Sequence, residues 1–222
     1  MTNSYRFVTI VAFFVTSLLA ANILIVKQIS VLGLTLPAAI IIFPISYIFG
    51  DILTEVYGYR QARRVIWLGF FCNLLLVASI WLVGILPAAS TFQAQEAYDR
   101  ILGNTPRFLI ASFTAYLGGE FINAYVLARM KVLTRGKWLW TRTIGSTILG
   151  EGVDSIIVLI ISFWGVIPTG VLMGMILWHW LFKSVYEIIA TPLTYLIVNY
   201  LKTKEKIDYY DIGTNFNPLR AN

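Results

Sequence analysis

Long apolar segments separated by short polar stretches dominate this chain of 222 residues. A helix needs about 20 mainly apolar residues to cross a bilayer. Six segments reach that length, at approximately residues 7–26, 36–57, 64–86, 106–128, 142–164 and 170–199. The pattern predicts an all-α integral membrane protein whose residues 1–200 form a six-helix bundle. Residues 201–222 are a polar cytoplasmic tail, which is either disordered or packed against the cytoplasmic face.

Basic residues lie in the loops between the apolar segments and alternate between the two ends of the predicted helices. One end carries Arg6, the arginines of 60–64, the basic residues of 129–142 and the lysines of 202–206, whereas the other end carries few. Because cytoplasmic loops are enriched in Lys and Arg, this alternation predicts that both termini are cytoplasmic. We therefore expect a multi-pass protein of the cell inner (plasma) membrane, surrounded by lipid.

Composition and charge exclude several other classes of protein. The chain is 58% hydrophobic and 13% charged. Its net charge of +6 is spread over short loops and forms no basic face, so we expect no nucleic-acid partner. Cys72 is the single cysteine, so no intramolecular disulfide can form. The apolar run after Arg6 is similar to a secretory signal, but it continues to Val26, reaches spanning length and is expected to be retained.

Polar residues recur at helical spacing in four of the six predicted helices, so each set shares one face. These sets are Asp51 and Glu55 in the second helix; Phe113, Tyr116, Glu120 and Asn123 in the fourth; Glu151 and Asp154 in the fifth; and His179, Lys183 and Glu187 in the sixth. Four such faces predict a shared polar interior. Pro44 and Pro192 predict bends in the second and sixth helices, beside that interior.

The charges on these faces do not balance. A charged residue at the centre of a membrane helix costs about 2.5–3.5 kcal/mol, so each needs a partner or a wet cavity. Four acids near the midplane, Glu120, Glu151, Asp154 and Glu187, face Lys183 alone. Structural pairing between helices is the simpler interpretation, but it leaves acids over, and protons, a cation or a donor-rich ligand must compensate them. The sequence therefore predicts a binding site within the bundle.

Three further polar residues are candidates for a gate or for proton coupling. Asp51 and Glu55 lie nearer the cytoplasmic end, where both can pair with Arg60, Arg63 or Arg64, and Asp51 either lines the site or closes an inner gate. His179 is the third, although a lone interior histidine is more often simply hydrogen-bonded in place.

Catalytic motifs are missing from the sequence. It contains no G-x-S-x-G elbow, no H-E-x-x-H pair and no P-loop. Ser155 and His179 are a conceivable nucleophile and base, but no motif supports them. We expect no enzyme, no cofactor and no bound metal.

Several motifs resemble one family in the same order along the chain. They are F-P-I-S-Y-I-F-G-D-I-L-T-E-V-Y-G-Y-R-Q-A-R-R from Phe43, G-G-E-F-I-N-A-Y-V-L-A-R-M-K from Gly118, T-R-T-I-G-S-T-I-L-G-E-G-V-D-S from Thr141, K-S-V-Y-E-I-I-A-T-P from Lys183 and G-T-N-F-N-P from Gly213. This set is similar to the queuosine precursor transporters, also called the vitamin uptake transporter family. The resemblance implies a six-helix carrier that imports 7-deazaguanine bases, the cyano and aminomethyl precursors of queuosine.

The polar faces suit such a base on chemical grounds. A carboxylate of Glu120, Glu151 or Asp154 can accept both the N1 proton and the 2-amino group of a guanine-like edge. Asn123 or Lys183 can bond the 6-oxo group, and Phe113, Tyr116 or Tyr186 can stack on the ring. A spare acid such as Glu187 would neutralise an aminomethyl cation. The sequence does not assign one role to each acid.

Energy coupling and partners stay open. Proton symport and facilitated entry with metabolic trapping are both compatible with these residues. The alternative class is a substrate-binding subunit of an energy-coupling-factor importer, because Ala12, Thr16 and Ala20 give the first helix a small-residue edge that suits docking. A homodimer is a further arrangement that the sequence allows.

Overall fold

The computed structural model describes residues 4–31, 34–103 and 106–220 and confirms that the chain is built from helices. In chain order the elements are α1 (Tyr5–Leu24), β1 (Gln28–Val31), β2 (Leu34–Pro37), the 3-10 helix η1 (Ala38–Ile41), α2 (Phe43–Tyr57), α3 (Tyr59–Gly84), α4 (Gln95–Leu102), α5 (Pro106–Leu133), α6 (Leu139–Phe163) and α7 (Thr169–Glu205). The strands β1 and β2 form an antiparallel pair in which Gln28 is opposite Pro37. This hairpin and the short helix α4 are additions to the predicted six helices.

Five of the six long elements are apolar and long enough to cross a membrane: α1, η1 with α2, α3, α6 and α7. Helix α5 has 28 residues, but it carries Glu120 and Asn123 in its middle and is not among the five. Many large apolar side chains point outward, including Leu75 (68% exposed), Ile189 (75%) and Leu196 (70%). Such side chains suit contact with lipid hydrocarbon.

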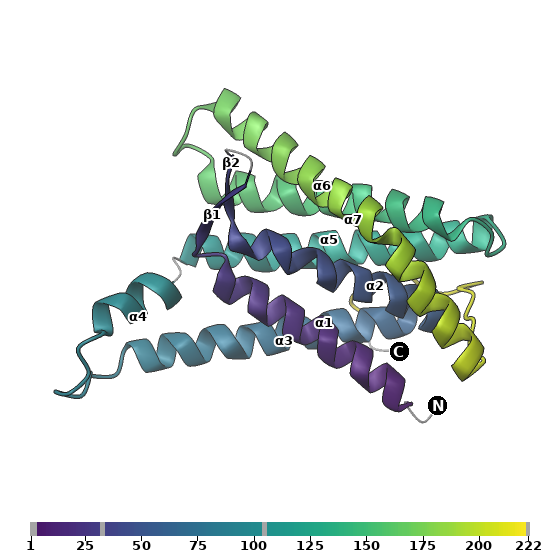
Figure 1. Cartoon of the computed structure of the whole chain (residues 1–222), viewed down its shortest axis with the longest axis horizontal. Coiled ribbons are helices and arrows are strands. Elements are labelled where there is room, and N and C mark those ends of the chain that lie inside the picture. Colours follow the sequence, from purple (N-terminus) through teal and green to yellow (C-terminus); the bar gives the residue numbers. More distant parts are fainter. Residues whose placement is uncertain (1–3, 32–33, 104–105, 221–222) are drawn as a thin grey trace.

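The two chain ends lie at the same end of the bundle (Figure 1). The Ser4 hydroxyl, at the start of α1, donates a hydrogen bond to Glu205, at the end of α7. The hairpin, α4 and the α6–α7 turn lie at the opposite end of the molecule in the same view. An even number of crossings agrees with this arrangement, while the cytoplasmic location of the termini stays a prediction from the basic loops.

The two prolines predicted to cause bends occupy different positions in their helices. Pro44 occupies the first turn of α2, where its missing N–H is not needed, and the 3-10 helix η1 ends just before it at Ile41; a bend at this position stays a prediction. Pro192 lies inside α7, which is one continuous helix from Thr169 to Glu205. A bend at Pro192 stays a prediction.

Helices α5 and α6 pack closely through glycines. A Cβ atom on Gly150 would lie 2.8 Å from the Cβ of Asn123 and 2.9 Å from the carbonyl oxygen of Gly119. Small residues allow membrane helices to approach in this way, because lipid gives little hydrophobic drive for association. The close approach sets the polar faces of α5 and α6 against each other.

The tail after α7 is packed on the bundle. The Asp211 carboxylate accepts a hydrogen bond from the backbone N–H of Tyr59 (2.9 Å), and the Tyr59 hydroxyl donates to the carbonyl of Phe216 (2.9 Å). The Trp67 indole N–H donates to the carbonyl of Pro218 (2.9 Å). Residues 206–220 thus pack on this end of the bundle, and the cytoplasmic location of this end stays a prediction.

Candidate functional site

The predicted midplane residues come together from four helices. Asp51 lies on α2, Glu120 and Asn123 on α5, Glu151 and Asp154 on α6, and Lys183 and Glu187 on α7. All seven are buried, with 0–4% of each residue exposed. We call these seven residues the acidic cluster. The helical spacing of the polar positions brought them to the interior because each helix turns one polar face inward.

Lys183 is the cation at the centre of the acidic cluster. Its Nζ atom lies 2.8 Å from the Glu151 carboxylate and 2.5 Å from the Asp154 carboxylate. The ammonium group also lies 4.2 Å from the centre of the Phe43 ring, a cation–π distance. Lys183 thus holds α6 and α7 together and balances part of the negative charge.

Other polar atoms of the acidic cluster have no hydrogen-bond partner among the described residues. Both carboxylate oxygens of Glu120 and both of Glu187 are buried and unbonded. The Asn123 amide donates to Asp51 Oδ1 (2.7 Å), while Asp51 Oδ2 and Asn123 Oδ1 remain unbonded. Buried polar groups in proteins are nearly always hydrogen-bonded, so this concentration of free acceptors calls for donors that the described residues do not supply.

These groups also lie within electrostatic range of one another. Glu120 interacts with Glu151, Asp154 and Lys183, and Asp51 interacts with Glu187 and Glu120. The five carboxyl groups therefore act on one another around a single ammonium group. Like charges at short range disfavour simultaneous ionisation, so protons or a ligand with N–H donors must relieve the imbalance.

The acidic cluster is closed in this structure. Its unbonded oxygens are shielded from solvent, and none of its members lines the cavity between α1, α3 and the end of α7. A heterocyclic ligand consequently needs the helices to separate before it can enter.

Of the three predicted aromatic residues, Phe113 and Tyr116 turn toward α3, and Tyr186 on α7 is partly buried against the apolar core. The Phe113 ring packs edge-to-face on Phe70, with centroids 5.2 Å apart. The Tyr116 hydroxyl donates to the carbonyl oxygen of Ile66 (2.9 Å). A stacking role for either residue stays a prediction.

The last residue expected near the site, His179, is hydrogen-bonded. Its Nδ1 atom lies 3.0 Å from the Ser155 hydroxyl, on the neighbouring helix α6. Among the described residues there is no group of three or more His, Cys, Asp or Glu side chains that could hold a metal ion.

Glu55 belongs to a separate ionic network near the chain ends. Arg142 binds its carboxylate with two nitrogens, Nε at 2.7 Å and Nη2 at 2.8 Å. Lys202 lies 2.5 Å and Lys131 3.5 Å from the same carboxylate. The expected partners Arg60, Arg63 and Arg64 are therefore wrong, because the basic residues that reach this buried position come from α5, α6 and α7.

Asp208 of the tail joins the same network. Its carboxylate lies 2.6 Å from Lys131 Nζ and 2.9 Å from Lys202 Nζ. Partial burial raises the pKa of Asp208, but the hydrogen bonds from Lys131 and Lys202 outweigh it and hold the pKa below its ordinary value. The tail is thus tied by charge to α2, α5, α6 and α7.

Helical spacing also places Tyr47 and Thr147 on the polar faces of α2 and α6, and their hydroxyls are buried and unbonded like the acidic cluster beside them. Sequence reasoning missed part of the ionic network at Glu55. Lys131 and Arg142 were interpreted only as topology signals. Their positions just inside the ends of helices were the available clue, since a basic residue there can turn inward as easily as outward.

Comparison with known proteins supports a transport role. The model of a family described as "Putative vitamin uptake transporter" matches residues 37–197. A Bacillus subtilis protein named "Probable queuosine precursor transporter" is 27% identical over 187 residues, covering 84% of this chain and 82% of that protein. The Escherichia coli "Queuosine precursor transporter" is 26% identical over 148 residues, covering 65% and 63% respectively. A Haemophilus influenzae "Probable queuosine precursor transporter" is 26% identical over 122 residues, covering 55% and 49%. No solved structure matches this chain.

Proposed function

Since this chain belongs to the vitamin uptake transporter family, we propose that it imports queuosine precursors, the 7-deazaguanine bases, across the inner membrane. The multi-pass helical fold and the names of three relatives support this proposal. The same names favour a transporter over an enzyme. The observation that carries the substrate class is the set of buried, unbonded carboxylate oxygens in the acidic cluster.

A guanine-like base supplies the donors that this cluster needs. Its N1 proton and 2-amino group point in nearly the same direction, so one carboxylate can accept both in a charge-assisted pair. Glu120 is our choice for this role, because both of its oxygens are unbonded, whereas Asp154 accepts a hydrogen bond from Lys183 and Glu151 forms an ion pair with Lys183. Burial in a low dielectric strengthens such a pair.

The remaining edges of the base have partners in the same cluster. Lys183 lies within the cluster and can donate to the 6-oxo group, and the unbonded Asn123 Oδ1 can accept from the pyrrole N–H. Glu187 has two free oxygens on α7 and would neutralise the cation of an aminomethyl substituent. The cyano base lacks that cation, so Glu187 distinguishes the two precursors in this scheme.

Uptake of precursor by a defined strain tests the proposal. A host that can neither make the precursors nor import them is given this chain and one supplied base, and queuosine in its transfer RNA is measured. We expect modification to return with the cyano or the aminomethyl base. If queuosine stays absent from transfer RNA with both bases, although the protein is present in the membrane, the proposed substrate class is rejected.

Proton symport is our proposal for energy coupling. Five carboxyl groups share one ammonium group, so a proton that enters with a neutral base would improve the charge balance of the closed state. Precursor uptake into vesicles should then rise when an inward proton gradient, with the outside more acidic, is imposed. Uptake that is indifferent to collapse of the gradient would favour facilitated entry with metabolic trapping.

One observation favours a second candidate, the substrate-binding subunit of an energy-coupling-factor importer. Ala12 and Thr16 on α1 are exposed, and Ala20 is half-buried, so the small-residue edge faces away from the bundle and is free to meet a partner helix. Transport in a host without the ATP-driven module separates the two candidates. Uptake that requires an added module would make this chain a subunit and not an autonomous carrier.

A further inference from the structure

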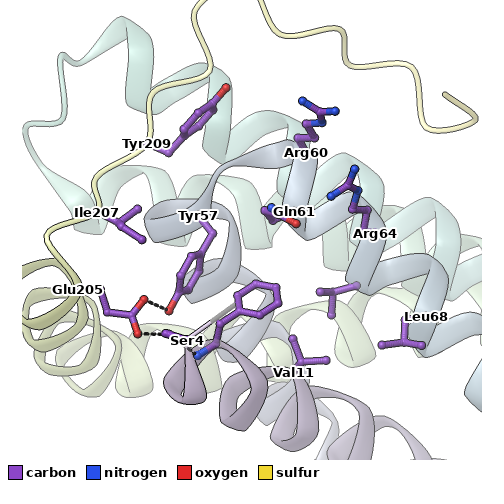
Figure 2. A pocket seen from close by; sticks show the side chains of 12 residues that line it. Ser4, Val11, Tyr57, Arg60, Gln61, Arg64, Leu68, Glu205, Ile207 and Tyr209 are labelled. Carbon is purple, nitrogen blue, oxygen red and sulfur yellow. Dashed lines mark hydrogen bonds between the residues drawn. The ribbon is translucent and has the colours of Figure 1, made fainter. Parts of the chain in front are cut away.

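A cavity of about 680 Å³ opens at the end of the bundle where the chain ends lie (Figure 2). Its walls come from α1, from the junction of α2 and α3, and from the last turn of α7 with the tail. None of its lining residues belongs to the acidic cluster. The cavity is thus a separate feature that the transport proposal does not use.

The walls are apolar on one side and cationic on the other. Val11 of α1 and Val65 and Leu68 of α3 line the apolar part, and Leu68 is 46% exposed. Arg60 and Arg64, both exposed, lie four residues apart on α3 and therefore share one face of that helix. Figure 2 shows Arg60, Arg64 and Leu68 following one another along α3, with Val11 on the opposite wall.

The two arginines have no acidic partner in the part of the chain that the structure describes. No ion pair involves Arg60 or Arg64, and both act repulsively on the neighbouring Arg63. Glu205 is the acid that lines the cavity, but it accepts hydrogen bonds from the hydroxyls of Ser4 and Tyr57 (2.8 Å for Tyr57). The positive charge at the cavity rim is therefore left for an external anion.

We propose that this cavity binds an anionic phospholipid. The phosphate would lie between Arg60 and Arg64, and an acyl chain would lie along Leu68, Val65 and Val11. Anionic headgroups are attracted to basic pockets between membrane helices on the cytoplasmic side, the side that the basic loops predict for this end. A soluble phosphate would use the arginines but not the apolar wall, so the cavity as a whole favours a lipid.

The test is lipid binding by the purified full-length protein in detergent, measured by native mass spectrometry. Phosphatidylglycerol is titrated against zwitterionic phosphatidylethanolamine with the same acyl chains, and glycerol phosphate is added as a soluble competitor. We expect preferential binding of phosphatidylglycerol, with little displacement by glycerol phosphate. Equal binding of both lipids, or full displacement by the soluble anion, would overturn the proposal.

Two variants separate the parts of the proposed site. Arg60→Gln with Arg64→Gln should weaken phosphatidylglycerol binding about 25-fold, since each basic residue near an anionic lipid contributes on the order of fivefold. The matched control, Lys137→Gln with Lys204→Gln, removes the same charge from exposed positions that do not line the cavity and should bind as the unmodified chain does.

The apolar wall is tested while the arginines stay in place. Val11→Trp fills that part of the cavity and should weaken binding of phosphatidylglycerol. It should leave unchanged the small fraction of bound lipid that glycerol phosphate displaces. Wild-type binding by the double arginine variant, or an equal loss in the lysine control, would contradict a site at Arg60 and Arg64. Thermal unfolding of each variant in detergent shows whether a loss of binding reflects a loss of fold.

Discussion

Glu120→Gln is the most direct test of the acidic cluster, because it separates binding from folding. Both oxygens of Glu120 are buried and unbonded, so the carboxylate makes no contact whose loss would weaken the fold. Replacing an unpaired buried charge by a neutral group of the same shape is expected to leave stability unchanged or raise it. The amide keeps the shape but presents N–H groups where the base also presents N–H groups.

The size of the binding effect follows from the bonds that Glu120 is proposed to make. Hydrogen bonds to a charged group contribute about 1.5–3 kcal/mol, so losing one such contribution lowers affinity about 10- to 150-fold. Uptake at low precursor concentration should fall by that factor while the apparent melting temperature in detergent holds or rises. Glu96→Gln is the control, since Glu96 is exposed and pairs with Arg100 on the surface (2.8 Å).

The assay measures initial rates of labelled precursor uptake over a range of concentrations, with the amount of membrane protein determined in parallel. Glu120→Gln that transports as the unmodified chain does would refute the role of Glu120 in recognition. A variant that loses transport together with thermal stability would instead show that this carboxylate is structural.

Three further predictions concern stability. Lys183→Met leaves Asp154 and Glu151 without their cation, and breaking a buried ion pair costs about 3–5 kcal/mol, so the melting temperature should fall; a second change, Asp154→Asn, should restore part of it. Gly150→Ala forces α5 and α6 apart and should cost about 1–3 kcal/mol, whereas Gly170→Ala, with open space around it, should cost little; equal effects would contradict tight packing at Gly150. Asp208 has a lowered pKa, so its contribution is present above about pH 4, its ordinary value, and is lost as the pH falls further. Asp208→Asn should therefore remove part of the acid sensitivity of tail docking in limited proteolysis, and an unchanged pH profile would contradict the role of this carboxylate.

The acidic cluster was predictable because two strong constraints act on it. Charge in a membrane interior must be compensated, and helical periodicity shows which residues share a face, so Glu151, Asp154 and Lys183 had to meet inside the bundle. Periodicity does not tell which neighbouring helix a face meets. For that reason periodicity does not predict that Phe113 and Tyr116 contact α3.

Other features depend on how helix ends converge, and a single sequence does not contain that information. Cytoplasmic loops are rich in Lys and Arg, and Arg142 fits this rule whether its side chain lies outside the bundle or binds Glu55 inside it. The rule therefore does not predict its burial. The hairpin of β1 and β2 was missed because its residues are apolar, as the start of a spanning helix is, and the second span was expected to begin at residue 36. Pro44 marks the true helical start, since proline is tolerated in the first turn.

The ionic network at Glu55 has a consequence for biogenesis. Glu55 is synthesised before all of its basic partners, and Lys202 follows it 147 residues later in sequence. During membrane insertion Lys131 and Arg142 can neutralise the carboxylate as α5 and α6 enter the bilayer, whereas the ion pair with Lys202 forms only after α7 has entered. Nascent chains truncated before Lys131 should therefore leave an unneutralised acid for quality-control proteases to recognise, whereas chains truncated between Arg142 and Lys202 should lack only the tie to α7 and the tail.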